Sequence, residues 1–218
     1  MKKIEILLKS VSGDEREGLQ KILQSKSNAP KDIIEDFWYN CQSIFGYTFG
    51  SEPSYNKILL KVCKKLKITE VQNRSDEEIE ICIAQLVMKT VWDKMNPEQR
   101  EEFEKKLRET SEKYDKSSSL VSSASIFGAL TAAQLSGFGV YLLASTTLGA
   151  ITGAVGLTLP FAVYTTMSSA IAVVIGPVGW IGAGLFAIWK LTGPNFKKLI
   201  PAIIYISALR AKEEGGFN

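Results

Sequence analysis

Histidine is absent from the chain and cysteine occurs only three times, and both shortages restrict the possible chemistry. Without histidine, the chain lacks the usual general base, the commonest metal ligand and any serine–histidine or cysteine–histidine couple. Cys41, Cys63 and Cys82 lie far apart among apolar residues, which indicates buried reduced thiols and not a redox pair. No GxGxxG occurs, and GPVGWIG lacks the lysine and hydroxyl of a P-loop. We therefore expect a protein that is not an enzyme and has no cofactor, no metal and no small-molecule substrate.

Charge is also missing from one long segment. The 73 residues from Ser117 to Trp189 include no Asp, Glu, Lys or Arg, although such residues make up 22% of the chain. These residues must lie in a membrane or in a deeply buried core, unlike the charged remainder. Basic and acidic residues balance up to Lys116, so the net charge of +3 comes from the residues after Trp189. Since no basic stripe is interleaved with aromatic residues, we expect no nucleic-acid partner.

The N-terminal part has the start signals and the apolar periodicity of amphipathic helices. Ser12 with Glu15, and Ser75 with Glu78, form S-x-x-E capping boxes. In a capping box, each of the two side chains bonds a backbone amide that would otherwise be unpaired. Segments with apolar residues at every third or fourth position are 33–45, 58–66 and 79–92.

One of these predicted helices is crowded with lysine. Lys57, Lys61, Lys64, Lys65 and Lys67 accompany its apolar residues. The simplest interpretation is a solvated helix face, and the sharper one is a patch for anionic lipid. Both interpretations stay open from the sequence alone.

Small residues at four-residue steps characterise the uncharged segment. In lipid, such steps place small side chains on one helix face and let two backbones approach closely. Glycine and proline in GPVGW interrupt the apolar run, and tryptophan suits a membrane interface. The residues expected in membrane insertion or helix packing are Gly128, Ala132, Ser136, Ser145, Gly149, Gly153, Gly176, Pro177, Trp180 and Trp189, and the lysines expected to face lipid are Lys190, Lys197 and Lys198.

Three stretches of the uncharged segment are candidates for membrane crossings, each of which needs about 20 apolar residues. Residues 121–143 meet that length, residues 146–166 meet it across Pro160, and residues 167–189 form the third candidate. The charged N-terminal part and the basic tail are both expected on the cytoplasmic side. Two crossings plus a re-entrant or interfacial stretch therefore fit best.

These patterns together predict an all-α protein with two kinds of helix. An N-terminal amphipathic helical domain is followed by glycine-rich apolar helical hairpins. The predicted divisions are a soluble helical domain (1–112), a linker (113–119), an uncharged, membrane-like helical segment (120–191) and a basic C-terminal helix and tail (192–218).

Several stretches resemble the YaaW family of uncharacterised bacterial proteins. The stretches are LLKSVSGDEREGL near the start, YNKILLKVCKKLKI and IEICIAQLVMK in the middle, and IGPVGWIG with GPNFKKLIPAIIYISALR near the end. Some members of that family carry a ubiquinol-cytochrome c chaperone-like label. The resemblance implies a bacterial origin and supplies no catalytic residues. The central segment is richer in glycine and threonine than a typical member, so the resemblance leaves the number of crossings open.

Two functions follow from the uncharged segment. The leading hypothesis is a non-enzymatic protein that inserts into or associates with the bacterial inner membrane through residues 120–190. We expect it in that membrane, or in the cytoplasm with membrane association. Its partner would be membrane lipid, it would form homo-oligomers, and its boldest form is a pore-forming or membrane-perturbing stress or defence protein. The alternative is a soluble helical scaffold or chaperone-like protein whose apolar segment is permanently buried. An intermediate possibility is a hairpin that amphipathic helices conceal until the protein meets a membrane.

Overall fold

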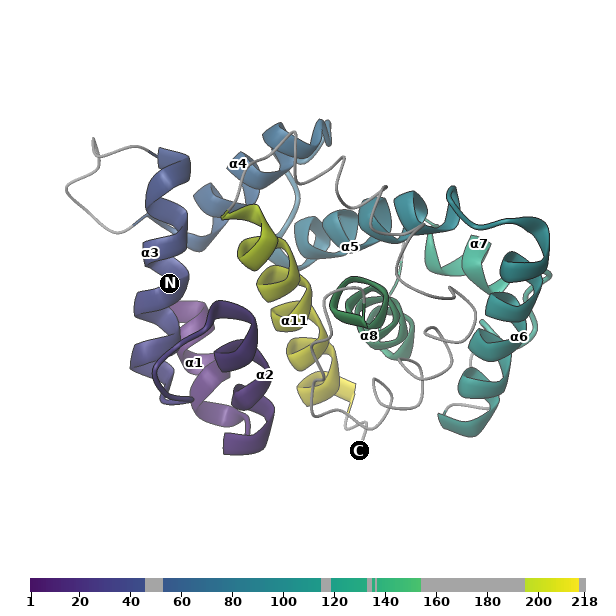
Figure 1. Ribbon diagram of the computed structural model, residues 1–218, viewed down its shortest axis with the longest axis horizontal. Coiled ribbons are helices and arrows are strands. Elements are labelled where there is room, and N and C mark those ends of the chain that lie inside the picture. Colours follow the sequence, from purple (N-terminus) through teal and green to yellow (C-terminus); the bar gives the residue numbers. More distant parts are fainter. Residues whose placement is uncertain (46–52, 115–118, 133–134, 136, 154–194, 216–218) are drawn as a thin grey trace.

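The computed structural model describes residues 1–45, 53–114, 119–132, 135, 137–153 and 195–215. Every regular element in these ranges is a helix, which confirms the all-α prediction (Figure 1). The helices are α1 (Lys2–Ser10), α2 (Gly13–Leu23), α3 (Pro30–Phe45), α4 (Tyr55–Leu66), α5 (Asp76–Trp92), α6 (Pro97–Tyr114), α7 (Ile126–Leu130), α8 (Phe138–Gly153) and α11 (Phe196–Gly215).

Local caps fix the starts of the N-terminal helices as predicted. The Ser12 side chain accepts from the Glu15 amide, and the Glu15 carboxylate accepts from the Ser12 amide, so α2 begins with a complete capping box. Ser75 and Glu78 form the same reciprocal pair at the start of α5. Each box satisfies two amides that the helix itself leaves unpaired, which is why these starts can be found from the sequence.

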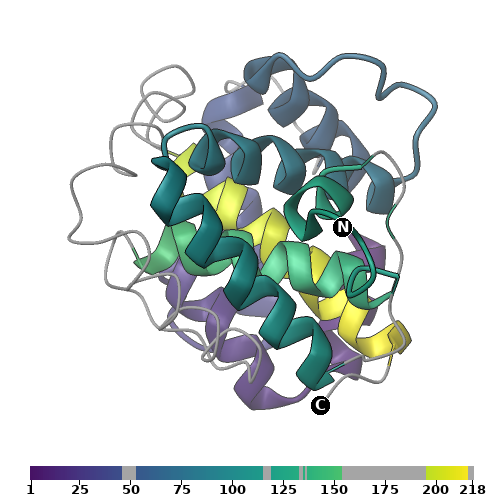
Figure 2. The same ribbon diagram turned by 90° about the vertical axis from the view of Figure 1, so that its right-hand side faces the viewer.

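Two helices, α8 and α11, form the centre of the molecule. α8 contacts α11 and α5, and α11 also contacts α1, α2 and α3. All residues of α8 from Phe138 to Ile151 are buried, and so are all residues of α11 from Leu199 to Leu209. Figure 2 shows both helices behind α6, with α1 and α2 on one side and α4 and α5 on the other. Within the described residues, α8 is thus the part of the uncharged segment that packs against helices from the charged parts of the chain.

The structure corrects the expectation of one continuous apolar helix over residues 121–143. α7 has five residues, a turn follows it, and α8 begins only at Phe138. Gly137 adopts a φ of 53°, a left-handed conformation that favours glycine and ends regular helix geometry. Gly128 and Ala132, expected to pack against another helix, are exposed.

Within the described ranges, no helix combines the length and the apolar composition that a membrane crossing requires. The second predicted crossing, 146–166, is described only as far as Gly153, and the third, 167–189, lies outside the described residues. The predicted division at residues 112–119 stays a prediction, and α11 from the predicted tail packs against the N-terminal helices.

Candidate functional site

The residues predicted for membrane insertion or helix packing are dispersed in the structure. Ser145 and Gly149 lie one turn apart in α8 and are both buried, while Gly153 is its last residue. Lys197 is exposed, whereas the half-buried Lys198 donates from Nζ to the Leu23 carbonyl at 2.9 Å and so binds protein. Those that lie outside the described residues are Ser136, Gly176, Pro177, Trp180, Trp189 and Lys190.

α8 has no polar face. None of its 16 residues is charged, although it lies at the centre of the molecule. The hydroxyls of Ser145 and Thr146 are buried without a hydrogen-bond partner, while Thr147 donates to the Leu143 carbonyl at 2.7 Å. An unpaired buried hydroxyl costs about 1–3 kcal/mol, so the packing of α8 retains a penalty that two small apolar side chains would avoid.

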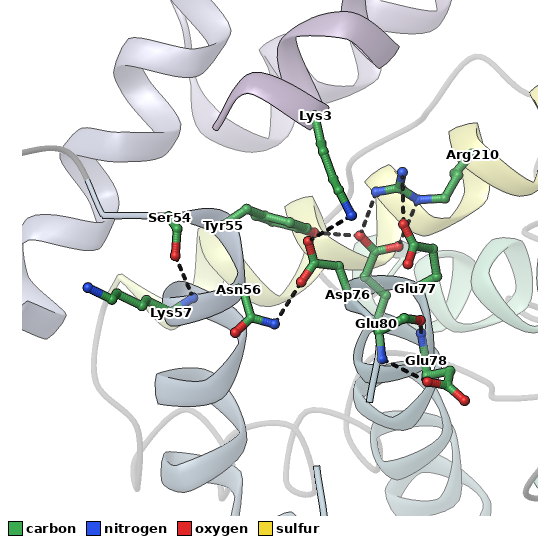
Figure 3. A network of polar contacts seen from close by, with 11 residues as sticks. Lys3, Ser54, Tyr55, Asn56, Lys57, Asp76, Glu77, Glu78, Glu80 and Arg210 are labelled. Atoms are coloured by element: carbon green, nitrogen blue, oxygen red, sulfur yellow. Dashed lines mark hydrogen bonds and ion pairs between the residues drawn. The ribbon is translucent and has the colours of Figure 1, made fainter. Parts of the chain in front are cut away.

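A buried ion pair joins α5 to the C-terminal helix α11. The Glu80 side chain on α5 is 0% exposed, and its carboxylate accepts from Arg210 of α11, with Nη2 at 3.0 Å from Oε1. Tyr55, at the start of α4, donates its hydroxyl to the same Oε1 at 2.8 Å (Figure 3). One carboxylate therefore holds three helices together.

Further polar side chains surround this ion pair. Arg210 Nη1 lies 3.4 Å from Glu77 Oε1, one turn earlier on α5. Asp76 accepts from the Asn56 side chain at 2.8 Å and lies 3.9 Å from the Lys3 ammonium of α1. The network thus ties α1, α4, α5 and α11 at one point, as Figure 3 shows.

Burial sets the protonation of the network. It raises the pKa of Glu80 to about 7, although the Arg210 charge and the hydrogen bonds from Arg210 and Tyr55 act in the opposite direction. Burial and the nearby Glu80 charge raise the pKa of Tyr55 well above its ordinary value, so this phenol stays protonated. The cluster can hold helices together and exchange one proton near neutral pH, but the carboxylate at its centre, Glu80, is buried and out of reach of a substrate.

Four other polar contacts fasten α11 to the N-terminal helices. The Tyr205 hydroxyl donates to the Glu15 carbonyl at 2.6 Å, and the Lys212 ammonium donates to the Glu15 carboxylate at 2.7 Å. Asn195 donates to the Asn40 carbonyl at 3.1 Å, and the fourth contact is that of Lys198. Side chains of this 20-residue helix, and of the residue before it, therefore bind three backbone carbonyls and one carboxylate of residues far away in sequence.

The cysteines behave as the sequence predicts only in part. All three are free, and Cys41 and Cys63 are buried, but Cys82 is partly exposed. Burial raises the pKa of Cys63 to about 12, so this side chain stays a neutral thiol. Cys82 accepts from Arg74 Nη1 at 2.9 Å. In the described part of the chain, no group of three or more metal-ligating side chains comes together.

Sequence reasoning missed the Glu80–Arg210 pair, although a signal was present. Glu80 follows Ile79 within the apolar stretch of its helix, and Arg210 is the first charge after the uncharged run 199–209. A charge inside an apolar run is expensive to bury alone, so each of the two residues indicates a buried partner. The partners are 130 residues apart, and nothing local links them.

Comparison with known proteins gives one relative. The chain is 26% identical to a UPF0174 protein from Helicobacter pylori (strain J99 / ATCC 700824) over 180 residues, which cover 81% of this chain and 68% of the relative. That name states no activity, ligand or partner, and the YaaW resemblance is not confirmed by it. No family model and no solved structure matches the chain.

Proposed function

We propose that the protein is a non-enzymatic helical protein that associates with a bacterial membrane through residues 120–190, and that it exists in a closed form with part of this segment inside its core. The observation that carries the proposal is α8, an uncharged helix buried from Phe138 to Ile151 between α5 and α11. A helix that is apolar on all sides fits either a protein core or lipid. We propose that α8 lies in the protein core in the closed form and in lipid after the protein has opened at a membrane.

The polar atoms of α8 support a closed form that can open. The unpaired hydroxyls of Ser145 and Thr146 weaken its packing in the core. In a membrane, such hydroxyls bond neighbouring helices, and the small residues Ser145 and Gly149 allow those helices to approach closely. Self-association of the inserted form is part of the proposal for this reason.

Opening requires α11 to separate from α5, because α11 covers α8. The Glu80–Arg210 ion pair and the Tyr55 hydroxyl bond oppose that movement. A buried ion pair stabilises less than apolar side chains of similar volume would, but it fixes one arrangement strongly against others. The ion pair therefore selects one arrangement of α5 and α11, and the closed form is less stable than it would be with apolar side chains at these positions.

A second candidate function is a helical scaffold or chaperone-like protein in which α8 never leaves the core. The observation that favours it is the burial of α8 from Phe138 to Ile151 and of α11 from Leu199 to Leu209, with α5 packed on both helices and α1, α2 and α3 on α11. In that case the protein partners would bind to the outer helices, and vesicles would not change the protein.

The deciding experiment exposes the full-length protein to anionic vesicles, floats them through a density gradient and washes them with carbonate. Floated material is then digested with proteinase K, because residues 117–189 contain no lysine or arginine for trypsin to cut. We expect wash-resistant protein with peptides from 120–190 protected from digestion. A chain that never floats and is digested identically with and without vesicles would refute the membrane function and favour the scaffold.

A further inference from the structure

The outer face of α4 carries lysines that form no ion pair with any carboxylate in the described part of the chain. From Ser54 to Thr69 the chain has no Asp or Glu. The structure exposes Lys57, Lys64 and Lys65 of α4 and Lys67, the residue that caps the helix C-terminus. We term these four residues the lysine face of α4. Lys61 on the same helix is half-buried. Among the ion pairs of the described residues, none includes a member of the lysine face.

Four other helices, α1, α2, α5 and α6, each pair one lysine with an acidic residue three or four positions away, as charged surface helices ordinarily do. The pairs are Lys9 with Glu5 at 2.6 Å, Lys21 with Glu17 at 2.8 Å, Lys89 with Asp93 at 2.9 Å and Lys106 with Glu109 at 3.1 Å. Exposed lysines outside the ion pairs of the described residues also occur on α3 and α6, for example at Lys31 and Lys105. The lysine face of α4 differs in that four such lysines lie within eleven residues of a stretch that has no Asp or Glu.

The core fixes the direction in which these lysines point. Ile58, Leu59, Val62 and Cys63 on the opposite side of α4 are all 0% exposed. The helix therefore cannot rotate to separate the like charges or to bring them near carboxylates of other helices. Lys57 and Lys64 lie two turns apart on one side of α4, so an external anionic surface along this side would contact both ammonium groups.

We propose that the lysine face of α4 is the surface through which the closed protein first binds an anionic phospholipid bilayer. This inference rests on the proposed membrane function and names its lipid partner. Clusters of four or more lysines on an amphipathic helix attract anionic lipid headgroups, with an effect that falls off within a Debye length. A bilayer fits this face better than a nucleic acid does, because the only aromatic side chain of α4, Tyr55, is buried and unavailable for stacking on bases.

The test compares two variants of the full-length protein with equal net charge. The first carries Lys57→Gln, Lys64→Gln, Lys65→Gln and Lys67→Gln. The matched control carries Lys9→Gln, Lys21→Gln, Lys89→Gln and Lys106→Gln, which removes four lysines that are already paired. Partition of both variants and of the wild type is measured on phosphatidylcholine vesicles with and without phosphatidylglycerol, at low and high salt. Thermal unfolding confirms that both variants fold.

The wild type should bind only the vesicles with phosphatidylglycerol, and high salt should weaken that binding. The lysine-face variant should lose on the order of a hundredfold in partition, whereas the control variant should lose only a few-fold. Equal losses in both variants would mean that net charge alone matters and would overturn the proposal. Preferential loss of binding to single-stranded RNA, with vesicle binding unchanged, would overturn it in favour of a nucleic acid.

The outcomes also separate this inference from the proposed function. If the lysine-face variant still floats like the wild type with residues 120–190 protected, the membrane function is supported. The proposal that α4 binds the bilayer first is then refuted. If neither the wild type nor any variant binds vesicles, the membrane function fails and the lipid surface fails with it.

Discussion

Arg210→Met removes the cation that lies 3.0 Å from the fully buried Glu80 carboxylate. Breaking a buried ion pair from one side typically costs 3–5 kcal/mol, because the remaining charge has no solvent and no partner. Glu80 can limit this cost by binding a proton, since burial already raises its pKa to about 7 with Arg210 present. We therefore expect the free energy of unfolding at neutral pH to fall by about 3 kcal/mol, at the lower end of that range.

A double-mutant cycle in urea tests the pair itself. Glu80→Met alone should also destabilise the protein by about 2–3 kcal/mol, because it leaves the Arg210 guanidinium and the Tyr55 hydroxyl without their shared acceptor. Glu80→Met with Arg210→Met should lose less than the sum of the two single losses by about 2 kcal/mol or more, since two apolar side chains replace the pair and only the Tyr55 hydroxyl stays without its acceptor. Additive losses in the double variant, or single losses under about 1 kcal/mol, would refute the reasoning.

Amide hydrogen exchange tests which helices the Arg210→Met substitution loosens. In the Arg210→Met variant, amides of α11 and α8 should exchange faster, because α11 loses its contact with α5 and covers α8 less firmly. Amides of α6 form no part of the network and should exchange as in the wild type. Uniform acceleration across all helices would indicate global destabilisation and count against a specific hold on α11.

Three further predictions follow from the central helices. Because the folded pKa of Glu80 is about 7 and its ordinary value is 4.5, the folded state binds this proton more tightly, so its contribution to stability is present below pH 4.5 and is lost as pH rises through about 7. Urea titrations should show about 3 kcal/mol of this loss in the wild type and none of it in Glu80→Gln. Gly18→Ala should cost about 1–3 kcal/mol in thermal or urea unfolding, since its Cβ would lie 2.1 Å from the tyrosine hydroxyl of α11, and an unchanged midpoint would contradict the close packing. Ser145→Ala with Thr146→Val should stabilise the closed form by about 1 kcal/mol or more and reduce vesicle binding, whereas Thr147→Val, whose hydroxyl is already bonded, should not stabilise it.

The sequence predicted well what local chemistry decides. The capping boxes that begin with Ser12 and Ser75 mark helix starts because all their atoms lie within four residues. Helix α1 escaped notice, although Ile4, Leu7 and Leu8 stand at helical spacing and are buried. The helix has only nine residues and four of them are charged, so its apolar positions are too few to form a clear periodic pattern.

The surroundings of the uncharged segment could not be predicted in the same way. A sequence that is apolar on every side of a helix fits lipid and protein core equally, so the composition of α8 does not say which helices cover it. The break at Gly137 was visible as a glycine, but its effect depends on a φ of 53° that the fold selects. The Glu80–Arg210 pair depends on α11 returning across the N-terminal helices, which no periodicity encodes.

The central helices combine two features that a core built for stability alone would avoid. Glu80 and Arg210 occupy space that apolar side chains could fill at lower desolvation cost, and Ser145 and Thr146 hold hydroxyls that gain nothing in the closed form. All four residues lie on α5, α8 or α11, the helices that must separate if the uncharged segment is to leave the core. Buried hydroxyls without a partner among the described residues also occur at Ser25 and at Ser111 of α6, so they are not confined to the helices that would have to separate. The Glu80–Arg210 pair, which ties α5 to α11, is therefore the polar feature that agrees best with a closed form that must open.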